Sequence, residues 1–331
     1  MTSQRLNGSK VLKGVSAFAL SCPPEGGGAP LLLSKAIAGA GINLPYVTVV
    51  RHGQGCLITL AVEALYEKKV LSLLKEGSFG EVTCRCRSCA IVSLFPHQSD
   101  PGIPAALFSS FGRAGLAVQG MANSPSALSV LIREEQLEPV SRVLFEAFTF
   151  RTCRTPEEWK AAQEGKEALY KEVVASYQEK RPKVYGVICR TNQQLVSILL
   201  DDPSLSTAAP VLSEAAERGL RLSLIVSGPF RSNGPFHLTY CLPRAQGGEP
   251  SDSPAEPVAV FSMNGPHFGD RYGITSELLA ALGQNSVPLL ALNCTVASIT
   301  GAVPGRDLDA ALDTIQECFE VPSVMTGDVP A

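Results

Sequence analysis

The sequence is poor in aromatic residues, in charge of either sign and in uninterrupted apolar runs. Aromatic residues make up 6% of the 331 residues, and 28 Lys and Arg against 31 Asp and Glu leave a formal net charge of -3. A chain so close to neutrality offers no basic surface to a phosphate backbone, so we expect no nucleic-acid partner. Its hydrophobic content of 45% is nevertheless enough to fill folded cores and excludes a wholly disordered chain.

Segments that direct a chain into a membrane or out of the cell are also missing. Residues 1–10 are polar and lack the apolar core of a secretory signal. The charge-free run 278–305 is interrupted by Gly, Pro, Asn and Gln, as expected of helix ends, turns and strands rather than a membrane span. The ten cysteines are too sparse for a disulfide scaffold. We therefore expect a soluble, cytoplasmic protein with no membrane partner and with buried, reduced thiols.

A recurring order of elements is what the sequence does contain. An apolar strand, a turn rich in Gly, Pro or Asp, an apolar helix, a glycine and another strand recur along the chain. Glycine just after a helix supplies the left-handed residue that satisfies the last carbonyl groups. The glycines expected in this role are Gly41, Gly115, Gly219 and Gly283.

These repeats predict an α+β fold of four tandem modules. The first shows the βαββαβ order of the ferredoxin-like plait, in which two helices cover one face of a four-stranded antiparallel sheet. The third module is incomplete or rearranged, because no second helix follows its strands. The expected boundaries are 11–89 and 90–154 for modules one and two, 155–182 for an amphipathic linker helix, 183–242 for module three, 243–257 for a flexible loop and 258–331 for module four.

The linker helix is expected from its first turn and its apolar stripe. Residues 155–158, Thr-Pro-Glu-Glu, have the pattern of a capping box with proline at the first helical position. The stripe that follows at helical spacing consists of Trp159, Ala162, Leu169, Val173 and Tyr177. This helix divides the chain into two halves.

Residues 115–148 contain two informative blocks, SVLI at 129–132 and RVLFEAF at 142–148. They resemble a strand and a helix in the closing segment of the second ACT regulatory domain of aspartate kinases. Residues 268–274, FGDRYGI, resemble the Asp-Arg-Pro-Gly-Val turn of that family, with Tyr272 in the proline position. Weaker matches are a shorter turn at 100–103, a helix-to-strand joint at 38–43 and the Asp-Asp-Pro run at 201–203.

The same family resemblance also predicts what the chain does not do. A kinase of this family would begin with a Lys-Phe-Gly-Gly phosphate-binding segment and a catalytic domain, and the sequence contains neither. We therefore expect two tandem regulatory pairs without the kinase domain. The protein is predicted not to be an enzyme and to have no catalytic residues, cofactor or metal.

The turn between the first strand and first helix of each module is the expected binding site. Helix amides exposed at such a turn can hold a carboxylate, and a nearby Asp can receive an ammonium group. In ACT domains this turn and the second-strand backbone of a partner module form an amino-acid pocket. The resemblance implies these ligand residues: Asp100, Gly102 and Ile103 in module two, and Asp270, Tyr272, Gly273 and Ile274 in module four. The alternative is that the same residues only cap helices and form turns.

Other motifs point less clearly to chemistry. Cys84, Cys86 and Cys89 have a spacing that suggests a metal, but the intervening Arg85 and Arg87 fit a strand with inward cysteines and outward arginines. The four histidines have no evident Asp or Ser partner for nucleophilic catalysis. The strands corresponding to the RNA-binding face of a plait carry no aromatic side chains, which argues against RNA binding.

These observations favour a non-catalytic regulator or sensor that binds a free amino acid or similar small molecule at interfaces between modules. Its expected partners are this amino-acid effector and an amino-acid biosynthetic enzyme, and a homodimer is favoured because paired plaits leave sheet edges and helix faces that associate readily. The alternative is a structural or protein-interaction module, a regulatory subunit that has lost ligand binding. Ligand-dependent stabilisation would distinguish the two.

Overall fold

The computed structural model describes residues 4–23, 28–163, 181–231, 234–244, 256–265, 268, 271–295 and 298–326. In this part of the chain, one sheet contains 13 strands, and a separate sheet contains two. Neighbouring strands of the large sheet run antiparallel, except for the parallel pair β9 (Gly186–Leu200) and β15 (Val324–Thr326). A large antiparallel sheet with separate helices confirms the α+β class.

The elements follow one another in the strand, helix and strand order expected from the repeats. The first half of the chain contains β1 (Gln4–Leu6), β2 (Gly8–Cys22), α1 (Ala29–Gly39), β3 (Tyr46–His52), β4 (Gly55–Glu63), α2 (Glu67–Glu76), β5 (Glu81–Phe95), α3 (Gly102–Ala114), β6 (Gly120–Asn123), β7 (Leu128–Arg133), α4 (Leu137–Ala147), β8 (Phe148–Phe150) and α5 (Pro156–Gln163). After β9, the second half contains α7 (Ala209–Glu217), β10 (Leu224–Pro229), β11 (Phe236–Pro243), β12 (Val258–Asn264), α8 (Ile274–Gln284), β13 (Ala291–Thr295), β14 (Ser298–Pro304), α9 (Leu308–Cys318) and β15.

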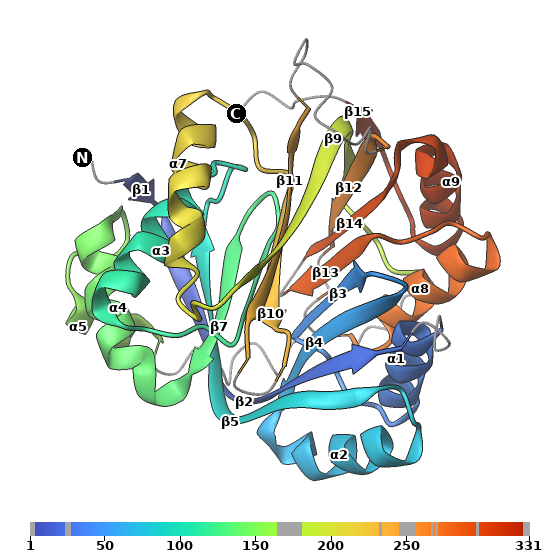
Figure 1. Ribbon diagram of the computed structural model, residues 1–331, viewed down its shortest axis with the longest axis horizontal. Helices are drawn as coiled ribbons and strands as arrows, with labels where there is room; N and C mark the ends of the chain where they lie inside the picture. Colours follow the sequence, from blue (N-terminus) through green and yellow to red (C-terminus); the bar gives the residue numbers. More distant parts are fainter. Residues whose placement is uncertain are drawn as a thin grey trace.

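The large sheet closes on itself. Its strand order is β11-β10-β6-β7-β5-β2-β4-β3-β13-β14-β12-β9-β15, and β11 also pairs with β9. β9 pairs with β12 through residues 186–193 and with β11 through residues 193–200, so one strand joins the two ends. Figure 1 shows α3, α4, α5 and α7 on one side of the strands and α1, α2, α8 and α9 on the other. The helices therefore cover the outside of a closed sheet.

Two strands, β5 and β9, are longer than the sequence predicts. β5 continues through the predicted boundary between modules one and two, and β9 continues as one strand through most of the first part of module three. Near the boundary between modules one and two the pairing of β5 with β2 is irregular, and Ser88 has a φ of 52°. Because the chain continues without a turn, the predicted boundary between residues 89 and 90 lies within one strand.

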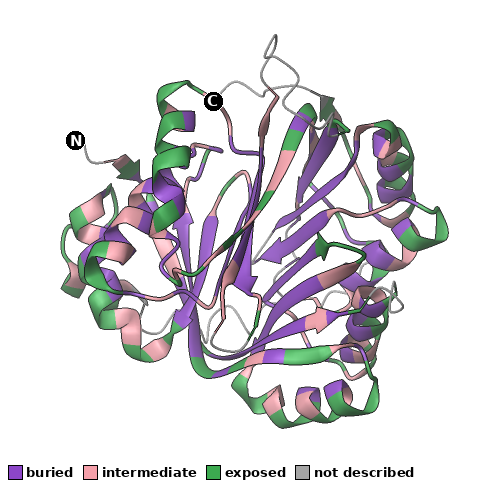
Figure 2. Cartoon of the chain, in the orientation of Figure 1, coloured by how far each residue is buried: buried purple, intermediate pink, exposed green. Residues whose placement is uncertain are grey.

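The buried apolar side chains form three clusters. One lies beneath α1, α2, α8 and α9, and a second lies beneath α3, α4 and α7. The third fills the inside of the closed sheet with smaller residues such as Ala17, Ala61 and Ala302. Figure 2 shows the buried residues concentrated on the strands and the exposed ones on the outer faces of the helices. Strands such as β10 thus contribute alternate side chains to the inner cluster and to one outer cluster, whereas β2 and β9 reach both outer clusters.

Three of the four predicted helix-ending glycines adopt the left-handed conformation. Gly41, Gly115 and Gly219 have φ values of 69°, 64° and 68°. Gly283 instead lies inside α8, and Ser286, with a φ of 56°, is the left-handed residue after this helix. The prediction for Gly283 is therefore wrong, because the helix continues past this glycine.

Some predicted features fall partly outside the described residues. The linker helix is represented by α5, whose Trp159 is buried against the α3 and α4 cluster, whereas Leu169, Val173 and Tyr177 lie outside the described residues. The expected loop at 243–257 lies mostly outside them as well. Within the described residues, no helix is both long and apolar enough to cross a membrane.

Candidate functional site

Helices α1 and α8 pack side by side because the strands beneath them pair with each other in the large sheet. Within the closed sheet, strands β3 and β13 pair antiparallel, from Tyr46 opposite Thr295 to Val50 opposite Ala291. The same apolar cluster contains Leu33 of α1 and Leu278 and Leu282 of α8. Segments more than two hundred residues apart in sequence thus form one interface, which has a cavity at each end.

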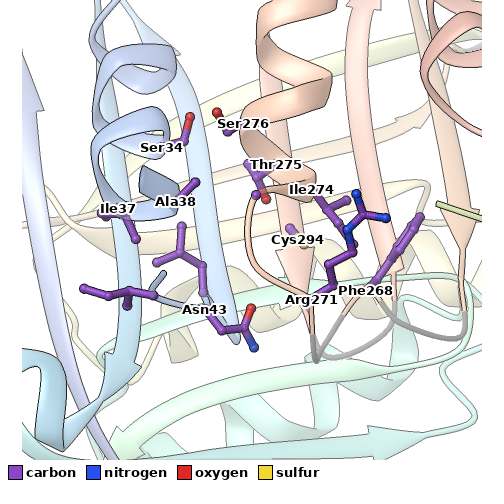
Figure 3. A pocket seen from close by; sticks show the side chains of 13 residues that line it. Ser34, Ile37, Ala38, Asn43, Phe268, Arg271, Ile274, Thr275, Ser276 and Cys294 are labelled. Atoms are coloured by element: carbon purple, nitrogen blue, oxygen red, sulfur yellow. The ribbon is translucent and has the colours of Figure 1, made fainter. Parts of the chain in front are cut away.

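The first cavity lies at the beginning of α8 and the end of α1 (Figure 3). Its volume of about 10 Å³ is close to what one water molecule needs. Both the helices and the connections beside them contribute to the wall. The lining residues are Ser34, Ile37, Ala38, Ile42, Asn43, Leu44, Phe268, Arg271, Gly273, Ile274, Thr275, Ser276 and Cys294.

The beginning of α8 gives this cavity a positive character. Among the described residues no side chain caps the helix, so its first amide groups keep their hydrogen-bonding capacity there. Gly273, with a φ of 93°, precedes the helix, and a Cβ at this position would lie 3.8 Å from Ala38 of α1. Arg271 adds a guanidinium group, whose Nη2 lies 3.2 Å from Glu277 Oε1. The arrangement suits a carboxylate.

Of the four ligand residues predicted in this region, two lie on the cavity wall. Gly273 and Ile274 line it, whereas Tyr272 is 52% exposed and is not part of the wall. Asp270 lies outside the described residues. The cavity also includes Asn43, at the end of the helix-to-strand joint that resembles the ACT family, and Ser34, to which no sequence motif points. Only the pairing of α1 with α8 brings these residues together.

The second predicted group, Asp100, Gly102 and Ile103, lies in a filled turn at the start of α3. Asp100 Oδ1 accepts a hydrogen bond from the Gly102 amide at 2.8 Å, and Ile103 is buried in the α3 and α4 cluster. A Cβ on Gly102 would collide with the side-chain amide of Gln4 from β1. Arg190 Nη1 donates a hydrogen bond to Ser99 Oγ at 2.9 Å. The described contacts of this turn are therefore with the chain itself.

The second cavity at the α1–α8 interface has a volume of about 290 Å³. It lies at the beginning of α1 and the end of α8, so the two cavities occupy opposite ends of the helix pair. Most of its wall is apolar, and Arg51, Gln54 and Cys56 supply the polar groups. The remaining lining residues are Pro23, Gly28, Pro30, Leu31, Val49, Gly55, Leu279, Leu282, Gly283, Val287, Pro288 and Leu289.

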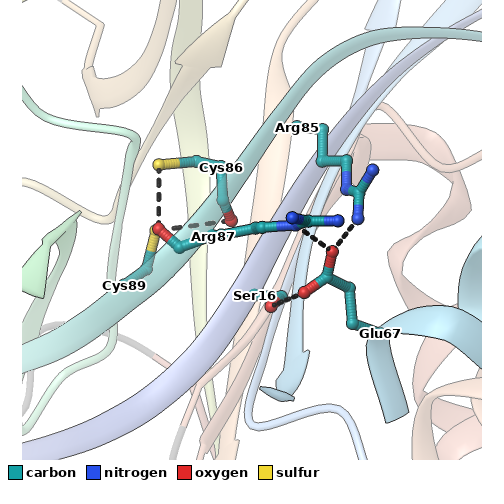
Figure 4. Close-up of polar contacts among 6 residues, drawn as sticks. All are labelled: Ser16, Glu67, Arg85, Cys86, Arg87 and Cys89. Atoms are coloured by element: carbon teal, nitrogen blue, oxygen red, sulfur yellow. Dashed lines mark hydrogen bonds and ion pairs between the residues drawn. The ribbon is translucent and has the colours of Figure 1, made fainter. Parts of the chain in front are cut away.

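Cys86 and Cys89 of β5 face the inner cluster, whereas Arg85 and Arg87 face outward and Cys84 is half-buried. Arg87 Nε lies 2.7 Å from Glu67 Oε1, Arg85 also pairs with this carboxylate, and Ser16 Oγ donates a hydrogen bond to Glu67 Oε2 at 2.9 Å (Figure 4). Cys86 and Cys89 are buried. A hydrogen bond from the Cys89 thiol lowers the pKa of Cys86 to about 7. Nowhere in the described residues do three His, Cys, Asp or Glu side chains gather as a metal site would require.

Two histidines are buried in the neutral form. Burial lowers the pKa of His97 to about 4 and that of His237 to about 3. Neither lines the cavities at the α1–α8 interface. His267, which adjoins the turn before α8, lies outside the described residues.

No protein-family model matches the sequence, and no curated protein matches it. The solved structure of aspartate kinase from Synechocystis matches 100% of this chain with a TM-score of 0.74 at 17% sequence identity, and the chain spans 58% of that structure's length. The ligand-free regulatory subunit of aspartate kinase from Thermus thermophilus matches 44% of this chain over 100% of its own, with a TM-score of 0.39 at 22% identity. A structure of aspartokinase α and β subunits matches 43% of this chain over 97% of its own, with a TM-score of 0.38 at 24% identity.

The full-length match establishes a likeness of fold to an aspartate kinase and corrects one prediction. The sequence predicted a protein that is not an enzyme and a regulator that is non-catalytic. This prediction is contradicted, because the solved structure that covers the whole chain is that of an enzyme. The absence of a motif from the printed sequence was too weak a basis for excluding an enzyme.

Proposed function

We propose that the chain consists of four ACT-like modules and forms the amino-acid-binding regulatory region of an aspartate-kinase-type enzyme. Four segments support the module count, because each places its three strands in the same spatial order, with the third between the first and second. These triplets are β3-β4-β2, β6-β7-β5, β10-β11-β9 and β13-β14-β12. In each segment a helix follows the first strand, and the third segment has no second helix in the described residues.

The observation that carries the binding proposal is the convergence of polar groups on the first cavity. Arg271 and the beginning of α8, which no described side chain caps, offer positive charge to a carboxylate. Ser34, Asn43 and Ser276 supply hydrogen-bonding groups from the α1 side and the α8 side. Apolar side chains such as Ile37 complete the wall. A small zwitterion with a short side chain matches this mixture of groups.

The small volume of the cavity suggests how binding is transmitted. A space of about 10 Å³ holds no amino acid, so a ligand must separate α1 from α8 before it can fit. The separated arrangement would then have contacts with the ligand that the closed arrangement lacks. A ligand shifts an equilibrium between two conformations by this difference in affinity. The movement would reach the sheet through β3 and β13, which lie beneath the two helices.

Thermal unfolding of the full chain with each protein amino acid tests this proposal. At 100 times its dissociation constant, an effector stabilises the folded state by about 2.7 kcal/mol. Arg271→Met should remove the response to the effector. Arg142→Met is the matched control, since Arg142 forms an exposed ion pair with Glu138 on α4, outside the cavity, and should leave the response unchanged.

The alternative, an interaction module that has lost ligand binding, draws support from the closed cavity and from the filled turn before α3. It would be favoured if no amino acid raised the unfolding temperature. Stabilisation that survives Arg271→Met would place the ligand elsewhere in the molecule. Homodimer formation, an enzyme partner and a cytoplasmic location stay predictions of the sequence.

A further inference from the structure

Two cysteine thiols face each other beside the second cavity, and one of them, that of Cys56, lines it. Cys22 is the last residue of β2, and Cys56 lies directly opposite it in the antiparallel pair of β2 and β4. Opposite residues of an antiparallel pair have Cα atoms about 4.5–5.5 Å apart. A disulfide spans Cα separations of about 4.4–6.8 Å. The backbone therefore already holds the two cysteines at a distance that a disulfide can bridge.

The cavity gives a small oxidant access to this pair. Cys56 is half-buried and lines the cavity of about 290 Å³, whereas Cys22 is buried beside it. Arg51 lies opposite Cys56 in the pair of β3 and β4, so a cation and two thiols form one row across three strands. Other cysteines of the apolar clusters, such as Cys241 and Cys294, are buried and do not line this cavity.

We propose that Cys22 and Cys56 form an oxidisable pair that hydrogen peroxide converts into an intramolecular disulfide. The thiolate of the pair attacks one peroxide oxygen, giving a sulfenic acid and hydroxide. The second thiol attacks the sulfenic sulfur, forming the S–S bond and releasing water. Two thiols lose two electrons and two protons, and one peroxide becomes two water molecules.

The interaction between the two thiols favours the first step. A hydrogen bond with Cys56 lowers the pKa of Cys22, although burial opposes this shift, and the same bond raises the pKa of Cys56. The pair therefore loses its first proton more readily than an isolated buried thiol does. The product would tether the end of β2 to the hairpin between β3 and β4, and so stiffen one end of the α1–α8 interface. This chemistry does not depend on amino-acid binding at the other end.

Peptide mapping of the reduced full chain after a peroxide titration tests the proposal. We expect a Cys22–Cys56 linkage, reversed by dithiothreitol, before any other cysteine reacts. Cys22→Ser and Cys56→Ser should each block the linkage and leave a sulfenic acid that dimedone captures on the remaining cysteine. Cys86→Ser is the matched control, since it removes one thiol of the other hydrogen-bonded pair and should leave the linkage intact.

Two results would overturn the proposal. One is a Cys86–Cys89 linkage that forms first, while Cys22 and Cys56 stay available to iodoacetamide. The other is that peroxide changes the alkylation rate of none of the ten thiols. Mapping of the unsubstituted chain decides between these results and the expected one even where a serine variant fails to fold.

Discussion

The two helix-pair interfaces of this molecule share one architecture but differ at the turn before a helix. α1 and α8 lie over the joined strands β3 and β13, and α3 and α7 lie over β6 and β10. At the first interface, the turn before α8 opens onto a cavity lined by Arg271. At the second, the turn before α3 is packed against Gln4, and its Asp100 caps its own backbone. The same topology therefore allows one turn to open onto a cavity and the other to be filled by a neighbouring side chain.

The joints beneath the two interfaces differ as well. β3 and β13 pair over five residues each, whereas β6 and β10 pair over two. Gly120 and Gly228 lie close to the shorter joint, and their lack of a side chain lets Tyr46 of β3 and Thr59 of β4 approach. The second interface is thus fitted more closely to the inside of the closed sheet.

The largest effect is expected from truncating the core beneath either interface. Phe108→Ala beneath α3 and Leu278→Ala beneath α8 each remove a side chain that is 0% exposed. We expect losses in unfolding free energy of about 3–5 kcal/mol for Phe108→Ala and about 2–5 kcal/mol for Leu278→Ala, measured with urea. Because β2 and β9 contribute to both clusters, each variant should still unfold in one transition. Two separate transitions would show that the interfaces are independent.

A smaller loss is expected where the two halves meet inside the sheet. In Gly228→Ala the new Cβ would collide with Thr59 Oγ1 and lie 3.2 Å from His237 Nε2. We expect destabilisation of about 1–3 kcal/mol in urea unfolding, because a packed interior resists added volume. Gly39→Ala at the end of α1 is the control, since nothing lies within 4 Å of its added Cβ. Equal unfolding free energies for the two variants would show that Gly228 is not closely packed against Thr59.

Acid should weaken the second interface through Asp202. Burial would raise the pKa of this carboxyl, but hydrogen bonds from Ser204, Ser206 and Thr207 lower it to about 2. The folded pKa lies below the unfolded value of about 3.9, so its contribution is present above about pH 4 and is lost as the pH falls toward 2. Asp202→Ala should cost about 1–2 kcal/mol at pH 7 and flatten this part of the pH profile.

The control for that experiment is Asp201→Ala. Asp201 is the exposed neighbour of Asp202 and carries the same charge. It should change the unfolding free energy by less than about 0.5 kcal/mol. An acid transition that is the same in both variants would mean that Asp202 does not support the turn before α7.

The smallest effect on stability is expected from Gln4→Ala. This variant tests most directly whether the filled turn before α3 explains the difference between the two interfaces. The change removes the side chain that fills the space at Gly102 and should alter the unfolding free energy by less than about 0.5 kcal/mol. If Gln4 is what prevents binding at the turn before α3, the variant should bind two amino acids per chain. The unsubstituted chain should bind one, and titration calorimetry measures both stoichiometries. A stoichiometry that stays at one would assign the difference to another cause.

Local elements of this fold could be predicted because they depend on residues close in sequence. The turn residue Gly115 and the inward cysteines with outward Arg85 and Arg87 follow from backbone sterics and strand alternation, and the structure agrees with both. Gly283 shows where this reasoning fails. A glycine can lie inside a helix when packing favours an extra turn, so residue type alone did not place the end of α8.

Only the residues at the beginning of α8 could be predicted as part of the candidate site. Gly273 and Ile274 belong to a turn with a recognisable pattern, whereas Ser34 and Asn43 come from the first segment of the chain. No local rule states that the first segment packs against the fourth and the second against the third. The filled turn at Gly102 was equally hidden, because Gln4 reaches it from a strand that pairs with β8.

The sequence by itself determined the class of fold, the order of strands and helices and the turns from which ligand residues were chosen. These features depend on alternation, helical spacing and the backbone freedom of glycine, which act over a few residues. Only the tertiary structure decided that β9 closes the sheet, that α1 meets α8 and that Cys22 faces Cys56. Such contacts depend on burying complementary apolar faces from distant segments, and many pairings satisfy that requirement until the whole chain is packed.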